Sequence, residues 1–188
     1  CGRLSTVRQR RPKQLVVKTI TVRENIQRSC EDFNAGRFFE AHEHLEEIWQ
    51  NERGPVRDAY KGLIQIAAAF VHLTRGNYPG AERLLRTGTG YLEPFRAAGA
   101  LGFNIEAIAS AAEEAHVRLV AGGVTAFTTR ERPYYKVDLA ALRRQAVRDG
   151  AWGFDESGDA LEMEITVAGC RFRNHPKEGF RDVETGLV

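Results

Sequence analysis

The sequence predicts a mainly α-helical protein: a compact bundle of about five helices built from two tetratricopeptide-like helical hairpins, with a small C-terminal helix and β-hairpin appended. Apolar residues recur at helical spacing through residues 23–121. Gly36 and Gly76 stand just past two of these patterns, where helices commonly end. A motif that begins at each of these glycines makes the two hairpins resemble each other.

The repeated motif reads G-x-aromatic-x-x-A-x-x-x-L. Its first copy runs from Gly36 to Leu45 and its second from Gly76 to Leu85. In each copy the glycine ends one helix, the aromatic residue anchors the next, and the alanine lets two helices cross closely. Two copies are fewer than the roughly three that a solenoid needs, so we expect a closed bundle rather than an open array.

Each expected element follows from a local pattern. The β-branched run 14–22 favours a short strand or an extended arm. Thr21 and Asn104 have side chains that are preferred at helix N-caps. The helices are expected at Arg23–Asn34, Phe38–Gln50, Arg57–Arg75, Ala81–Phe95, Asn104–Val120 and Asp138–Arg148.

The C-terminal part differs in character from the bundle. Gly122 and Gly123 interrupt the last helical pattern of the bundle, and we place a domain boundary there. Alternation of apolar and polar residues over 161–167 predicts a strand, with a hairpin turn at 168–169 that returns along 170–173. The expected organisation is a basic arm (1–22), a helical bundle domain (23–121) and an extension with one helix and a short hairpin (122–188).

Composition sets limits on partners and location. The 188 residues are 43% hydrophobic and 28% charged, which is ordinary for a folded globular domain. The net charge of +2 does not favour nucleic acid as a partner, and we interpret the basic arm as solvated. The three cysteines lack disulfide or zinc spacing, which favours a cytoplasmic location. No apolar run has the length of a membrane helix, so we expect no membrane association.

The candidate functional site lies on the second expected helix. At about 100° per residue, His42 and Glu46 fall within the apolar face of this helix. An imidazole and a carboxylate turned towards a core are costly unless they are paired or bind something. The residues expected to face solvent are Glu40, His44 and Glu47. The pair His42 and Glu46 is therefore either a structural network, with Arg57 as a possible partner, or part of a binding site.

The third expected helix supplies the possible second wall of the site. Its polar stripe consists of Arg57, Asp58, Lys61, Gln65, His72 and Arg75. Two arrangements stay open, because this stripe either faces water or faces the preceding helix. In the second case His42, Glu46 and His72 are candidate ligands for a divalent zinc, iron or manganese ion. The candidate catalytic residues are then Glu43, Gln65 and Arg57. The spacing is not the H-E-x-x-H zinc code, because Glu46 stands where that motif has its second histidine.

Three motifs in order resemble domain-of-unknown-function family 309. They are the run from Phe33 to Trp49, the run from Lys61 to His72 and R-G-N-Y-P-G-A from Arg75 to Ala81, and the resemblance spans roughly residues 24–121. It implies an all-helical bundle, sometimes labelled a predicted metal-dependent hydrolase. The characteristic polar residues that it implies are His42, Glu43, Glu46, Arg57, Gln65, His72 and Asn77, with Trp49 beside them.

Two functional hypotheses follow. In the first, a metal held by His42, Glu46 and His72 lowers the pKa of a water molecule that Glu43 or Gln65 orients, and a small substrate is hydrolysed. In the second, the hairpins form a non-enzymatic interaction or oligomerisation module for a helix, a peptide or a second copy of the chain, and the polar cluster only fixes helix register.

Overall fold

The computed structural model describes residues 20–122, 132–163, 172–175 and 179–182. The chain divides into two compact units, one of which is Ile20–Met163. The other comprises Cys1–Thr19 and Glu164–Val188, and its described part is the strand pair β3 (Phe172–His175) and β4 (Gly179–Asp182). Of the predicted basic arm (1–22), residues 1–19 therefore lie outside the described residues.

The larger unit is mainly helical, as predicted. Its elements are β1 (Ile20–Thr21), α1 (Val22–Asn34), α2 (Phe38–Asn51), α3 (Arg57–Thr74), α4 (Tyr78–Leu92), the 3-10 turn η1 (Glu93–Phe95), α5 (Ile105–Gly122), α6 (Leu139–Asp149) and β2 (Glu162–Met163). The helix starts obey local chemistry. Thr21 caps α1 in a capping box with Glu24, and Asp138 caps α6. Asn104 accepts a hydrogen bond from the backbone N–H of Ala107 at the start of α5.

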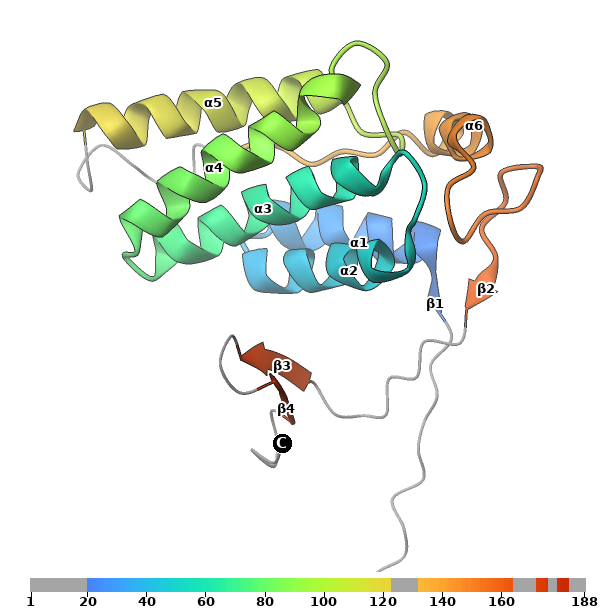
Figure 1. Ribbon diagram of the computed structural model, residues 1–188, viewed down its shortest axis with the longest axis horizontal. Helices are drawn as coiled ribbons and strands as arrows, with labels where there is room; N and C mark the ends of the chain where they lie inside the picture. Colours follow the sequence, from blue (N-terminus) through green and yellow to red (C-terminus); the bar gives the residue numbers. More distant parts are fainter. Residues whose placement is uncertain (1–19, 123–131, 164–171, 176–178, 183–188) are drawn as a thin grey trace, which may run out of the picture. The chain divides into compact units, whose positions relative to one another are not determined.

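Helices α1 to α5 pack in chain order, each against the next. Figure 1 shows α2, α3 and α4 side by side in front, with α1 behind α2 and α5 behind α4. Rings from three helices meet in the core: the centroid of Phe33 lies 5.2 Å from that of Phe38 and 5.6 Å from that of Phe70. Helix α3 is therefore the central element, with α2 on one side and α4 on the other.

The two hairpin turns confirm the predicted repeat and extend it. Gly36 and Gly76 have φ values of 83° and 70°, the left-handed conformation that glycine adopts without strain. In the first turn Arg37 donates to Asp32, Nε to Oδ1 at 2.7 Å. In the second turn the same i, i+5 positions are occupied by His72 and Asn77, whose side-chain nitrogens lie 2.6 Å apart.

A close approach of backbones fixes how α3 crosses α4. A Cβ atom added at Gly62 would lie 2.6 Å from Cδ2 of Leu92 and 2.9 Å from the carbonyl oxygen of Gly88. A Cβ atom at Gly88 would lie 3.0 Å from Cγ1 of Ile66. Small residues on both helices therefore allow the tight crossing, in the manner that the repeat motif predicts for its alanines.

Residues 132–163 pack against the helical hairpins rather than forming a separate unit. Tyr135 is 1% exposed, and its ring stacks on Phe33 with a centroid separation of 3.8 Å. The carboxylate of Glu52, at the end of α2, accepts a hydrogen bond from the backbone N–H of Trp152 at 2.8 Å. The compact unit thus runs to Met163, well beyond the boundary placed after residue 121, because a buried tyrosine and a buried carboxylate tie the two stretches together.

The strands pair differently from the predicted hairpin. Of the expected strand 161–167, Glu162–Met163 forms β2, which pairs antiparallel with β1. The expected turn at 168–169 lies outside the described residues. A hairpin does follow the C-terminal helix, but its strands are β3 and β4. Within the described residues no helix is long and apolar enough to cross a membrane.

Candidate functional site

His42 and Glu46 form a half-buried pair on α2. The Nε2 atom of His42 lies 3.5 Å from Oε2 of Glu46, and the two side chains are 23% and 31% exposed. Burial lowers the pKa of His42 while the charge of Glu46 opposes this shift, so the imidazole is held neutral near pH 7. Its Nδ1 atom is buried and makes no hydrogen bond within the described residues. The prediction that this pair turns inwards is therefore met only in part, because both side chains keep some contact with solvent.

The arrangement in which the polar stripe of α3 brings His72 and Gln65 to this pair finds no support among the described residues. The Nδ1 atom of His72 is engaged with Asn77, and a Cβ atom at Gly80 would lie 2.6 Å from it, so His72 lies at the α3–α4 turn. Gln65 lies on the side of α3 that packs against α4, because a Cβ atom added at Gly88 would lie 3.3 Å from the Cβ atom of Gln65. Among the described side chains, no hydrogen bond or ion pair joins His42 or Glu46 to α3.

The repeat explains the position of His72. Asp32 and His72 are equivalent residues, and each one contacts the residue that follows the turn glycine, Arg37 or Asn77. His72 therefore closes a turn in the second hairpin as Asp32 does in the first. The sequence already indicates this role, because His72 stands four residues before Gly76 just as Asp32 stands four residues before Gly36.

The donor set expected for a metal is not assembled in the described part of the chain. No group of three or more His, Cys, Asp and Glu side chains in that part is arranged to hold a metal ion. His42 and Glu46 supply two donors, and His72 belongs to the turn. The residues present therefore do not fit a three-ligand site, and the set His42, Glu46 and His72 stays a prediction without geometric support.

Arg57 and Glu43, two of the candidate catalytic residues, have different surroundings. Arg57 donates from Nη1 to the carbonyl oxygens of Trp49 and Glu52, and its guanidinium lies 4.0 Å from the centre of the Trp49 ring. These contacts stabilise the end of α2, whose last carbonyls lack helical partners. Glu43 is half-buried on α2. These contacts of Arg57 lie at the C-terminal end of α2, whereas His42 lies in its first half.

The face of α2 that was expected to be merely solvated carries a polar network to α1. Nε2 of His44 lies 3.1 Å from Oδ2 of Asp32, and Nδ2 of Asn25 donates to Glu47 at 3.0 Å. The prediction for His44 and Glu47 was wrong, because α1 packs on this side and supplies partners that the helical wheel of α2 alone does not reveal.

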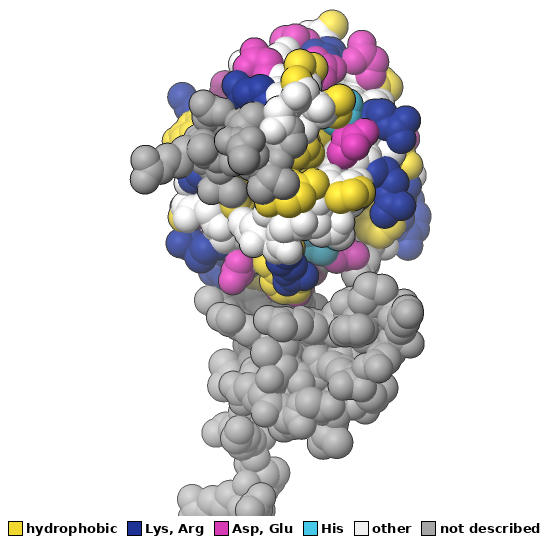
Figure 2. Space-filling model, turned by 90° about the vertical axis from the view of Figure 1, so that its left-hand side faces the viewer, with side chains coloured by type: hydrophobic (Ala, Val, Ile, Leu, Met, Phe, Trp, Pro, Cys, Tyr) yellow, Lys and Arg dark blue, Asp and Glu magenta, His cyan; other side chains and the backbone are white. Residues whose placement is uncertain are grey.

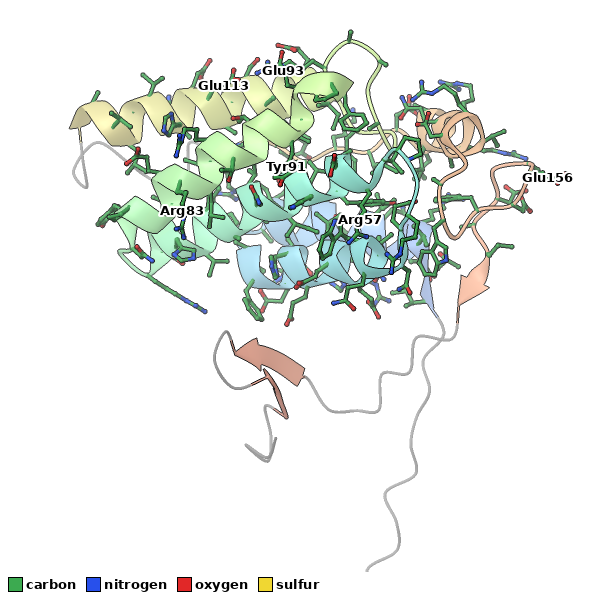
Figure 3. The ribbon with its side chains drawn as sticks, viewed as in Figure 1. Arg57, Arg83, Tyr91, Glu93, Glu113 and Glu156 are labelled. Carbon is green, nitrogen blue, oxygen red and sulfur yellow. The ribbon has the colours of Figure 1, made fainter. Side chains whose placement is uncertain are left out.

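Two cations of the predicted polar stripe lie beside aromatic rings of other helices, which the sequence did not indicate. We define the cationic stripe as Arg57 and Lys61 of α3 with Arg83 of α4. Arg57 lies over Trp49, and Nζ of Lys61 lies 4.5 Å from the centre of the Tyr91 ring. Figure 3 shows Arg57, Tyr91 and Arg83 on the near side of the layer formed by α2, α3 and α4.

Among the described residues the cationic stripe has no acidic partner in an ion pair. None of its three cations has an ion pair with another described residue, whereas Arg96 elsewhere pairs with Glu93, Glu106 and Glu113. Arg83 is close enough to His72 to lower the pKa of that histidine, after burial and Arg75. Dark blue side chains line the right-hand edge of Figure 2, which is the face turned towards the viewer in Figure 1. The stripe was detectable in the sequence as Arg57 and Lys61 one turn apart, but their aromatic neighbours come from two other helices.

Comparisons with known proteins agree with the motif resemblance. Residues 26–84 match the model of a family described as a domain of unknown function, DUF309. The predicted resemblance is therefore confirmed over these residues. Over 64 residues the chain is 41% identical to the uncharacterized protein YpuF of Bacillus subtilis (strain 168), a stretch that covers 33% of this chain and 37% of that protein. No solved structure matches the chain.

Proposed function

We propose that the unit Ile20–Met163 is a non-catalytic interaction module whose cationic stripe binds an acidic peptide segment of a partner protein. The observation that carries the proposal is that Arg57 and Lys61 on α3 and Arg83 on α4 have no carboxylate partner among the described residues. The match to a domain of unknown function leaves this choice open, since neither that description nor the name of the relative states an activity.

The aromatic neighbours prepare the stripe for anions. Trp49 holds the guanidinium of Arg57 and Tyr91 holds the ammonium of Lys61, so less side-chain freedom is lost when a ligand binds. Arg57 uses Nη1 for its recorded carbonyl contacts, and the rest of its planar group suits a carboxylate. Carboxylate side chains spaced along an extended or helical peptide would therefore meet cations that are already positioned.

The charges around the stripe favour a peptide over nucleic acid. Glu43 and Glu46 lie on the neighbouring helix α2, and the net charge of the whole chain is only +2. A continuous phosphate backbone would be repelled by these carboxylates and by the exposed Asp58 between Arg57 and Lys61, whereas a peptide can space its acidic residues to meet the three cations alone. The proposal thus narrows the second hypothesis from the sequence, an interaction module, to one kind of partner, an acidic peptide.

Binding of defined probes tests this proposal. A fluorescein-labelled alternating Glu-Ala peptide should bind the full chain, measured by anisotropy, and binding should weaken as salt is added. Lys61→Gln and Arg83→Gln should each weaken binding by about fivefold, while Arg144→Gln on the exposed surface of α6 should not. Equal binding of a Lys-Ala peptide, tighter binding of oligo-uridine RNA, or unchanged affinity in both stripe variants would each refute the proposal.

The metal-dependent hydrolase is the competing hypothesis. It requires His72 to join His42 and Glu46, and no observation on the described residues favours that meeting. Measuring the metal content of the purified chain separates the two hypotheses, because only the hydrolase needs a stoichiometric divalent ion.

A further inference from the structure

Residues 132–137 lie against the helical hairpins in the way that a bound peptide lies in a groove. Exposure alternates along the segment: Pro133 and Tyr135 are buried, whereas Tyr134 is 70% exposed and Lys136 is exposed. This is the period-two pattern of an extended chain with one face buried. Figure 1 shows the segment as a coil that passes behind α4 and leads into α6.

An asparagine clamp holds the backbone of this segment. Nδ2 of Asn34 donates to the carbonyl oxygen of Tyr135 at 2.6 Å, and Oδ1 of Asn34 accepts from the N–H of Tyr135 at 2.9 Å. One amide side chain therefore satisfies both backbone groups of one residue, which fixes the register of an extended chain without reading its side chains. Arg132 adds a hydrogen bond from Nη2 to the carbonyl oxygen of Asn34.

The side chain of Tyr135 is the anchor. Its ring stacks on Phe33 at 3.8 Å and meets Phe103 edge-on at 6.0 Å. Its hydroxyl group donates to the carbonyl oxygen of Leu63 on α3 at 3.0 Å. Burial raises the pKa of Tyr135 well above its usual range, so the phenol is a neutral donor. The pocket thus suits an aromatic ring of this length with a hydrogen-bond donor at its tip.

The outer side of the segment stays open to solvent. A depression of about 390 Å³ lies between α1 and residues 134–137, with Gln27, Glu31 and Lys136 in its lining. The segment is therefore held by alternate side chains and one clamp rather than enclosed on all sides. Such a mode of contact is the one that grooves use for extended peptides.

From these contacts we infer that the groove bounded by α1, α3 and Phe103 is a recognition site for extended Arg-x-x-Tyr segments, filled in this chain by its own residues 132–137. This groove lies on a different part of α3 from the cationic stripe, and the inference does not depend on the proposed function. The partner that it fits is a second protein segment with a tyrosine three residues after an arginine, able to replace the chain's own segment when that segment withdraws.

Competition within the chain determines how the inference must be tested. A tethered segment has an effective concentration of about a millimolar, so a peptide in solution cannot replace it in the native chain. Tyr135→Ala removes the anchor from the tethered segment and leaves the groove residues intact. A fluorescein-labelled peptide with the sequence of residues 130–138 should then bind this variant at least about tenfold more tightly than the native chain.

Matched controls separate recognition from nonspecific hydrophobic binding. The same peptide with alanine in place of the tyrosine should not bind Tyr135→Ala, nor should a peptide with phosphotyrosine there, because the pocket buries the phenol. The double variant Asn34→Ala/Tyr135→Ala should bind the peptide about tenfold more weakly than Tyr135→Ala, because it lacks the clamp. A folded Tyr135→Ala variant that fails to bind the peptide, or that binds all three peptides equally, would overturn the inference.

Hydrogen exchange in the native chain gives a second test that does not depend on the folding of a variant. The backbone N–H of Tyr135 should exchange through local release of the segment, at least about tenfold faster than the amides of the α3 core. Exchange of the Tyr135 amide only by global unfolding, at the rate of the most protected α3 amides, would show that the segment is a fixed part of the core and would overturn the inference.

Discussion

Glu52 offers the most direct test of how the hairpins depend on the residues beyond them. Its side chain is buried, with 1% exposure, and it ends α2. Oε1 accepts from the N–H of Gly54 at 2.5 Å and Oε2 accepts from the N–H of Trp152 at 2.8 Å. One carboxylate therefore fastens the α2–α3 turn to the stretch that follows α6, and we predict that Glu52→Ala destabilises the whole unit.

The magnitude follows from the groups that the substitution leaves without partners. A buried donor that loses its acceptor costs about 1–3 kcal/mol, so two such donors would cost about 2–6 kcal/mol. Gly54 and Trp152 are only half-buried and water can reach them in part, which reduces the expected loss in the free energy of unfolding to about 2–4 kcal/mol. Removing a buried charge returns part of its desolvation cost, which places the expected value in the lower half of that range. Glu52→Gln keeps one oxygen and should lose about half as much.

Urea denaturation followed by circular dichroism measures these changes, and the fluorescence of Trp152 reports on the same contact locally. Glu156→Ala is the matched control, because Glu156 is exposed and projects away from the unit in Figure 3; its stability should change by less than about 0.5 kcal/mol. A change below about 0.5 kcal/mol for Glu52→Ala as well would refute the view that this carboxylate joins the two stretches.

Three further predictions concern pH, metal and helix packing. Burial lowers the pKa of His42 and His44 from 6.5, so below that pH the unfolded chain binds protons more readily than the folded chain. The free energy of unfolding should therefore be at its full value above about pH 6.5 and should fall as the pH is lowered further. His44→Gln should reduce the loss of stability measured between about pH 7.5 and 5. An equal loss in native chain and variant would contradict this assignment for His44. The chain purified without an affinity tag should contain far less than one zinc, iron or manganese ion per molecule by mass spectrometry, and a stoichiometric ion that His42→Ala abolishes would restore the hydrolase hypothesis. Gly62→Ala should destabilise the unit by about 1–3 kcal/mol, because its Cβ would overlap Leu92, whereas Gly90→Ala, with nothing within 4 Å, should stabilise it by about 0.5–1 kcal/mol; equal effects in thermal unfolding would show that the crossing of α3 and α4 tolerates a methyl group.

The helices were predictable because their signals are local. Thr21, Asn104 and the glycines at 36 and 76 mark ends through chemistry that acts within a few residues, and the structure places caps and turns there. The repeat was also legible, since equivalent turns need equivalent residues. Periodicity likewise located α3, and Leu63, Ile66 and Phe70 are among its buried residues.

The parts that escaped prediction depend on contacts between distant residues. The pattern around Tyr135 gives no hint that its ring meets Phe33, about a hundred positions earlier, so the boundary after residue 121 came too early. His44 was assigned to solvent because a single wheel does not show that Asp32 of α1 lies opposite. His72 would lie near His42 only if the polar stripe of α3 faced α2, which is one of the two arrangements that the sequence leaves open. The sequence of α3 alone does not show that the side chain of His72 lies at the α3–α4 turn, beside Asn77 and Gly80.

The family match ends at residue 84, whereas the structural unit runs to Met163, and this difference bears on the inference about residues 132–137. Asn34 and Glu52 lie inside the matched residues 26–84, but the groups that they bind belong to Tyr135 and Trp152, outside the match. A hairpin pair that lacks such an extension would expose a groove beside Phe33 and leave the carboxylate of Glu52 with one partner fewer. The matched segment therefore offers a groove that some chain segment must cover, and in this protein the covering segment is its own.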